Sequence, residues 1–75
     1  MTTASETFIA FEGNLLPVRI ARTGNWISLT LCFPDGRKTD DIFSVMRKTE
    51  ALAWSDLATF INGYKAYIRN RLRTA

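Results

Sequence analysis

Apolar side chains alternate with polar or small ones along the first half of the chain, and turn-forming residues interrupt this alternation at regular intervals. The interruptions are Gly13-Asn14, Thr23-Gly24-Asn25 and Pro34-Asp35-Gly36. Alternation with a period of two is typical of half-buried strands, and Gly, Asn and Asp between such strands favour hairpin turns. The pattern therefore predicts an antiparallel β-meander with three strands before residue 34.

The alternation also predicts which face of the sheet is buried, once a two-residue loop is placed at Gly13-Asn14. The expected pairs are Glu12 with Leu15, Phe11 with Leu16, and Ile9 with Val18. The predicted core face carries Ile9, Phe11, Leu16, Val18, Ile20, Ile27, Leu29, Leu31 and Phe33. The opposite face, called the outer face below, carries Phe8, Ala10, Leu15, Pro17, Arg19, Ala21, Trp26, Ser28, Thr30 and Cys32.

The apolar residues of the segment from Lys38 to Met46 fit both the two-residue period of a strand and the 3.6-residue period of a helix. Its apolar residues suit a fourth strand, and they also suit a short helix opened by Thr39 and Asp40. We favour the strand because a hairpin turn precedes it.

From Thr49 onward the apolar spacing becomes helical, with repeats of three and four residues from Ala53 to Leu72. Thr49 followed by Glu50 suits a helix N-terminus. The spacing predicts one long helix of about six turns. Gly63 weakens its middle and Ser55-Asp56 offers a second start, so two shorter helices stay open.

These elements define an α+β fold, a four-stranded antiparallel meander packed against one long C-terminal helix (ββββα), with three strands and two helices (βββαα) as the alternative. The expected centre of the core is Val18, Leu29, Leu31, Phe60, Ile61 and Ile68. With 75 residues the chain has room for a single domain, 1–75, and we expect residues 1–6 to be flexible.

Composition predicts a soluble, cytoplasmic protein. Cys32 is the sole cysteine, so no intrachain disulfide can form, which suits a reducing compartment. The first residues lack the basic start and apolar stretch of a secretion signal, and no apolar run approaches the roughly 20 residues that cross a bilayer. We expect no membrane partner.

The sequence offers little catalytic chemistry. It contains no histidine, which removes the commonest general base and a common metal ligand. Cys32 is expected to be a packed or half-exposed thiol, and the acids Glu12, Asp40 and Asp41 are expected to be solvated charges instead of a Mg²⁺ site. We therefore expect a non-enzymatic protein with no cofactor and no metal.

The outer face carries unusually large apolar residues for a sheet surface in water, which suggests burial against another protein or a second copy of the chain. Interfaces favour aromatic residues and arginine at their centres. The expected contact surface, centred on Trp26, consists of Phe8, Leu15, Arg19, Trp26 and Thr30.

The net charge of +3 is unevenly distributed, because residues 57–75 contain Lys65, Arg69, Arg71 and Arg73 but no acid. Lys65, Arg69 and Arg73 recur every four residues and would form a basic stripe on the helix. Such a stripe can bind phosphates, and it also suits the negative end of a helix dipole. Nucleic-acid binding is therefore the alternative function.

One stretch resembles known DNA-binding domains. It runs from Val18-Arg19-Ile20-Ala21-Arg22 through Gly24-Asn25-Trp26 to Pro34-Asp35-Gly36-Arg37, with Thr49-Glu50-Ala51 opening a helix. Across about residues 16–66 it resembles the sheet-plus-helix domains of plant ethylene-response factors and of tyrosine-type integrase amino termini. In those families arginines and a tryptophan on the sheet contact DNA, which implies DNA contacts for Arg19, Arg22, Trp26 and Arg37.

In plan and size the chain also resembles the small phage-encoded anti-CRISPR inhibitors, which cover a surface of a larger nucleoprotein machine. The expected function is therefore a protein-binding module, an inhibitor carried by a phage or mobile element that obstructs a larger protein or nucleoprotein complex. The alternative is a small DNA-binding accessory protein that uses the sheet face or the basic stripe.

Overall fold

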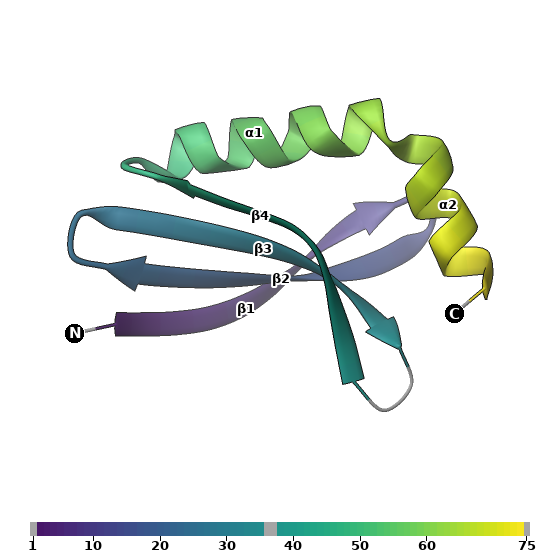
Figure 1. Cartoon of the computed structure of the whole chain (residues 1–75), viewed down its shortest axis with the longest axis horizontal. Coiled ribbons are helices and arrows are strands. Elements are labelled where there is room, and N and C mark those ends of the chain that lie inside the picture. The colour runs from purple at the N-terminus through teal and green to yellow at the C-terminus, as the bar shows by residue number, and fades with distance from the viewer. Residues whose placement is uncertain (1, 36–37, 75) are drawn as a thin grey trace.

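The computed structural model describes residues 2–35 and 38–74, in which four strands are followed by two helices (Figure 1). The strands pair antiparallel in the order β1-β2-β3-β4. Their bounds are β1 Thr2–Phe11, β2 Asn14–Thr23, β3 Trp26–Asp35 and β4 Lys38–Arg47, and the helices are α1 Glu50–Gly63 and α2 Lys65–Thr74. The α+β meander and its fourth strand are confirmed, whereas the single long helix is wrong.

The first hairpin turns one residue earlier than expected. Glu12 and Gly13 form the loop with φ angles of 49° and 85°, the two positive values that a type I′ turn requires. Phe11 therefore pairs with Asn14 and Ile9 with Leu16, so the predicted pairing is wrong by two residues. A shift of two leaves every side chain on its expected face.

In each of the later two hairpins, two residues separate the last pair of strand residues. Thr23 pairs with Trp26 around Gly24-Asn25, and Gly24 has a φ of 59°, which glycine adopts without strain. The third turn does not begin at Pro34, because Pro34 and Asp35 are still in β3 and Asp35 pairs with Lys38. Residues 36 and 37 of that predicted turn lie outside the described residues.

A bulge bends β4. Leu31 pairs with Phe43 but Cys32 pairs with Asp41, so Ile42 is an extra residue in the strand. Ile42 and Phe43 both pack against the core, and Figure 1 shows the change in direction of β4. Beyond the bulge, Asp41 lies on the outer face with Arg19.

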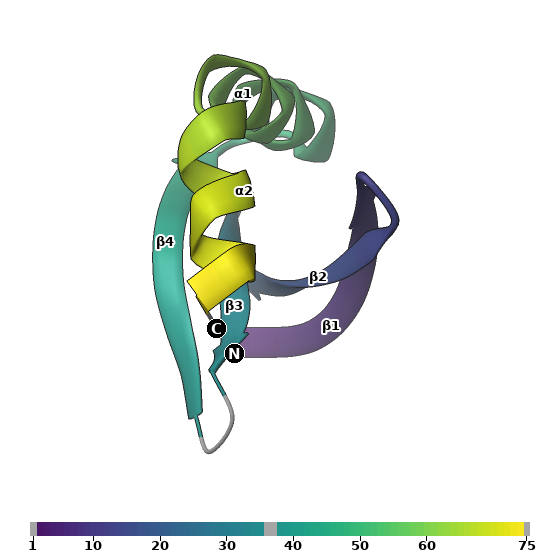
Figure 2. The same ribbon diagram turned by 90° about the vertical axis from the view of Figure 1, so that its right-hand side faces the viewer.

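The core fills the inner side of a strongly curved sheet, which Figure 2 shows as a trough with both helices on its inner side. Val18, Leu29, Leu31 and Ile68 are fully buried, as expected, while Phe60 and Ile61 are only partly buried. The buried cluster consists of Phe11, Leu16, Val18, Leu29, Leu31, Phe33, Val45, Ala53, Leu57 and Ile68.

The helical segment begins where the sequence predicted and breaks at Tyr64. Thr49 caps α1, because its hydroxyl accepts a hydrogen bond of 3.3 Å from the Leu52 backbone N–H. Tyr64 is not helical (φ −126°, ψ 33°), and its N–H donates to the Phe60 carbonyl at 3.0 Å. The break lets α2 turn across the end of the trough and bury Ile68.

No helix within the described ranges is long and apolar enough to cross a bilayer.

Candidate functional site

The outer face of the sheet carries an apolar patch on the β1–β2 hairpin. Phe8 lies opposite Pro17 and Ala10 lies opposite Leu15. Phe8 and Leu15 are 54% and 65% exposed, whereas Pro17 is buried. Pro17 fits here because the ladder between β2 and β3 begins only at Val18, so no N–H is needed on that side. We call Phe8, Ala10, Leu15 and Pro17 the hairpin patch.

Trp26 does not lie with the hairpin patch. It pairs with Thr23 at the opposite end of the sheet, six residues along β2 from Pro17, which corresponds to about 20 Å at the usual strand rise. Trp26 is 44% exposed, and Lys48 Nζ lies 5.6 Å from the centroid of its ring. A hollow of about 420 Å³ beside it is lined by Arg22, Gly24, Asn25, Trp26, Ile27 and Lys48.

Polar contacts occupy the outer face between these two ends. Arg19 forms an ion pair with Asp41 across β3, and the Thr30 and Ser44 hydroxyls lie 3.2 Å apart. Arg19 is the next residue after Pro17 on this face of β2, and Thr30 lies opposite Arg19, so both lie between the hairpin patch and Trp26. The five residues predicted to form one contact surface share a face but are divided into an apolar end, a polar middle and an aromatic end.

Cys32 is buried beneath the Arg19–Asp41 pair. Its thiol Sγ lies 3.4 Å from Asp41 Oδ1, to which it donates. Burial and the hydrogen bond to Asp41 raise the pKa of the thiol, and the Arg19 charge only partly opposes them. A thiol with a raised pKa carries little thiolate at neutral pH and is a poor nucleophile.

Four arginines in the described part of the chain are paired with carboxylates of the chain itself. Besides Arg19 with Asp41, Arg22 contacts Glu50 at 3.0 Å and Arg47 contacts Asp56 at 2.7 Å. Arg69 holds Glu12 with two hydrogen bonds of 2.8 and 2.5 Å. This bidentate contact lowers the pKa of Glu12.

These ion pairs reduce the positive charge that the residues predicted to contact nucleic acid can offer to phosphates. Arg19, Arg22 and Arg69 are each partly neutralised, and Arg69 of the basic stripe is bound to Glu12 of the β1–β2 hairpin. Lys65 and Arg73 are exposed on α2. Arg37 lies outside the described residues. The structure therefore does not assemble the predicted set into one basic surface.

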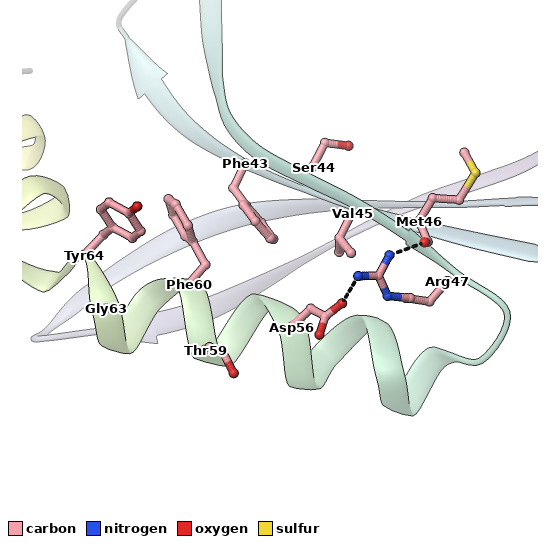
Figure 3. A pocket seen from close by; sticks show the side chains of 10 residues that line it. All are labelled: Phe43, Ser44, Val45, Met46, Arg47, Asp56, Thr59, Phe60, Gly63 and Tyr64. Carbon is pink, nitrogen blue, oxygen red and sulfur yellow. Dashed lines mark hydrogen bonds and ion pairs between the residues drawn. The ribbon is translucent and has the colours of Figure 1, made fainter.

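A groove that the sequence did not predict runs between β4 and α1 (Figure 3). Its volume is about 870 Å³, and stacked aromatic rings line one end, with ring centroids 4.4 Å apart for Phe43–Phe60 and 4.8 Å apart for Phe60–Tyr64. The Arg47–Asp56 pair lines the other end. The lining residues are Phe43, Ser44, Val45, Met46, Arg47, Asp56, Thr59, Phe60, Gly63 and Tyr64.

The described residues offer no metal-ligand cluster, since no three His, Cys, Asp or Glu side chains among them could hold one ion. No family model, curated protein or solved structure matches the chain.

Proposed function

We propose that the chain is a non-enzymatic protein-binding module that uses the outer face of its sheet, with the hairpin patch as the anchor. The observation that carries the proposal is the exposure of Phe8 and Leu15 side by side on a regular sheet. Monomeric proteins usually cover contiguous large apolar side chains, and protein interfaces bury them at their centres.

The polar middle of the outer face suits the same role. Arg19 and Asp41 are each about half exposed and bridge β2 to β4, so they present one charge of each sign to a partner. Charged groups in an interface mainly set specificity and association rate, while the apolar anchor sets affinity. The concrete form of the proposal, an inhibitor that obstructs a larger nucleoprotein complex, is supported by the plan and size of the chain alone.

Nucleic-acid binding is the weaker candidate because phosphate contacts require basic side chains that can leave their present partners. Arg19, Arg22 and Arg69 would each have to exchange an intramolecular carboxylate for a phosphate. The observation that keeps this candidate is the Trp26 hollow, where Lys48 and Arg22 flank an exposed aromatic ring that could stack on a base.

Matched leucine substitutions test the protein-binding proposal. A photo-crosslinking residue at Ala10 would trap the partner in nuclease-treated lysate of the source organism, and we expect Leu15→Lys to abolish the crosslink by removing an anchor worth about 2 kcal/mol. Leu52→Lys is the control, because Leu52 is 54% exposed but lies on α1. Equal crosslinking by both variants, or none by the wild type, would contradict the proposal.

A titration of labelled duplex DNA at two salt concentrations tests the alternative. We expect weak binding that is indifferent to the double change of Lys65 and Arg73 to alanine, which spares the Arg69–Glu12 contact. Tight binding of unrelated duplexes, with a salt slope that falls by about two units in the double variant, would favour the nucleic-acid function instead.

A further inference from the structure

The break at Tyr64 is a single non-helical residue between two helices whose apolar residues follow one continuous spacing. Leu57, Ile61, Tyr64, Ile68 and Leu72 recur at intervals of three and four residues on both sides of it. The φ of −126° and ψ of 33° at Tyr64 interrupt the helix, and no proline within residues 50–74 enforces the bend. If Tyr64 adopted helical angles, α1 and α2 would therefore form one amphipathic helix.

The bend leaves the start of α2 without the contacts that normally complete a helix N-terminus. Within the described helices, the N–H groups of Lys65, Ala66 and Tyr67 have no helical acceptor, and the first N–H bonded across the break is that of Ile68, which donates to the Tyr64 carbonyl at 3.0 Å. Tyr64 has no short polar side chain to cap them. The first turn of α2 carries Lys65 and no acid, which is the unfavourable charge at the positive end of a helix dipole. A continuous helix would supply three carbonyls of α1 as acceptors and would remove this terminus.

Contacts with the sheet hold α2 in the bent position. Ile68 is fully buried in the core. Arg69 makes its bidentate contact with Glu12, and the Arg71 guanidinium lies 5.4 Å from the ring centroid of Phe33. Figure 2 shows α2 crossing the end of the trough. The bent position therefore gains docking contacts and gives up helix hydrogen bonds, and two such opposing sets of interactions are what a two-state element requires.

We propose that α2 is a hinged cover, which swings about Tyr64 between the docked position and a state in which residues 50–74 form one continuous helix. In the second state α2 keeps its own backbone hydrogen bonds, gains those across the break and releases the end of the trough. The released surface includes Phe33 and Glu12, so the position of α2 controls access to that end of the core. The proposal goes beyond the protein-binding function and does not depend on it, because the hairpin patch lies on the opposite face of the sheet.

Lys65→Pro separates the two states, because proline suits the first position of a helix and cannot continue one. In the docked state the N–H of residue 65 has no helical acceptor, whereas in the continuous helix proline would lose that hydrogen bond and clash with the Ile61 carbonyl. Tyr64 already lies outside the helical region, which is disfavoured before proline. Lys65→Ala is the matched control, since it removes the same charge and keeps the N–H.

NMR relaxation dispersion of the backbone measures the exchange between the two states. We expect exchange on the microsecond-to-millisecond timescale at residues 64–72 in the wild type and in Lys65→Ala, with the continuous helix populated at about 1–10%, and no exchange in Lys65→Pro. In the minor state the ¹³Cα shift of Tyr64 should become helical while residues 69–73 stay helical. Coil shifts for residues 69–73 would overturn the proposal, because α2 would then unfold instead of swinging. Absence of exchange in the wild type, or equal exchange in the proline and alanine variants, would also overturn it.

Glu12→Gln tests the docked side of the same equilibrium. Glutamine keeps the shape of the side chain and removes the charge that holds Arg69, so we expect the population of the continuous helix to rise about twofold to fivefold. Glu6→Gln on β1 is the control, because it removes an acid that does not contact α2. A minor population no larger in Glu12→Gln than in Glu6→Gln would contradict the proposal, since docking of α2 would then not compete with the continuous helix.

Discussion

At the scale of single residues, the Arg19–Asp41 pair and the thiol of Cys32 form one small polar cluster on the outer face. The bulge at Ile42 creates it, because the extra residue moves Asp41 onto the outer face opposite Cys32. Alternation alone placed Cys32 outward and predicted nothing about Asp41 except a solvated charge. A bulge depends on contacts across the sheet, so sequence periodicity does not reveal it.

The buried thiol predicts a loss of stability in alkaline solution. The folded state raises the pKa of Cys32 above its ordinary value of 9.0, so the folded protein holds this proton more tightly than the unfolded chain. The resulting stabilisation is complete below pH 9 and is lost as pH rises through the folded pKa. We expect urea unfolding to show a steeper decline above pH 9 for the wild type than for Cys32→Ala. Parallel declines in the two proteins would contradict this assignment.

At the scale of elements, the contact between α2 and the β1–β2 hairpin joins segments that are 57 residues apart in sequence. Ile68 buries against the core, and Arg69 holds the turn residue Glu12, whose backbone has a positive φ. Positive φ is uncommon outside glycine, asparagine and aspartate. Glu12 therefore combines an unfavourable turn conformation with a favourable ion pair.

The Glu12–Arg69 contact predicts a pH-dependent anchoring of α2. Arg69 lowers the pKa of Glu12 from its ordinary value of 4.5, so the pair stabilises the fold above that value and loses its effect as pH falls through the folded pKa. We expect Glu12→Gln to lower the melting temperature at neutral pH and the difference from wild type to shrink below pH 4.5. The control is Glu6→Gln on β1, and a pH-independent difference for Glu12→Gln would argue against the ion pair.

Sequence periodicity predicts some features of these elements and misses others. Alternation placed Phe8 and Leu15 on the outer face correctly, because an error of two residues in register does not change the face. The fourth strand followed from the hairpin turn before it. The helix break at Tyr64 did not follow, because Gly63 only permits a break and the packing of α2 across the trough selects it. The β4–α1 groove did not follow either, because the sequence predicts Phe60 in the core and places Phe43 in a segment that suits both a strand and a helix.

At the scale of the whole molecule, one core joins both layers. The inner faces of the strands contribute aliphatic and Phe side chains from Phe11 to Val45, and the helices add Ala53, Leu57 and Ile68. The curvature of the sheet lets so short a chain surround these residues on several sides (Figure 2). A 75-residue domain has a free energy of unfolding of about 4–11 kcal/mol, so each large buried side chain is a considerable share of it.

Leu29 tests this central core most directly, because it is fully buried in the middle strand pair and pairs with both Ile20 and Val45. We expect Leu29→Ala to lower the free energy of unfolding by about 2–5 kcal/mol through lost apolar burial and the cavity left behind. Leu52→Ala is the matched control, since the 54% exposed Leu52 side chain should change stability by about 0.5 kcal/mol or less. Urea titration followed by circular dichroism measures both variants against the wild type. A midpoint for Leu29→Ala close to that of Leu52→Ala would mean that the trough does not enclose Leu29 and that the assignment of the buried face is wrong.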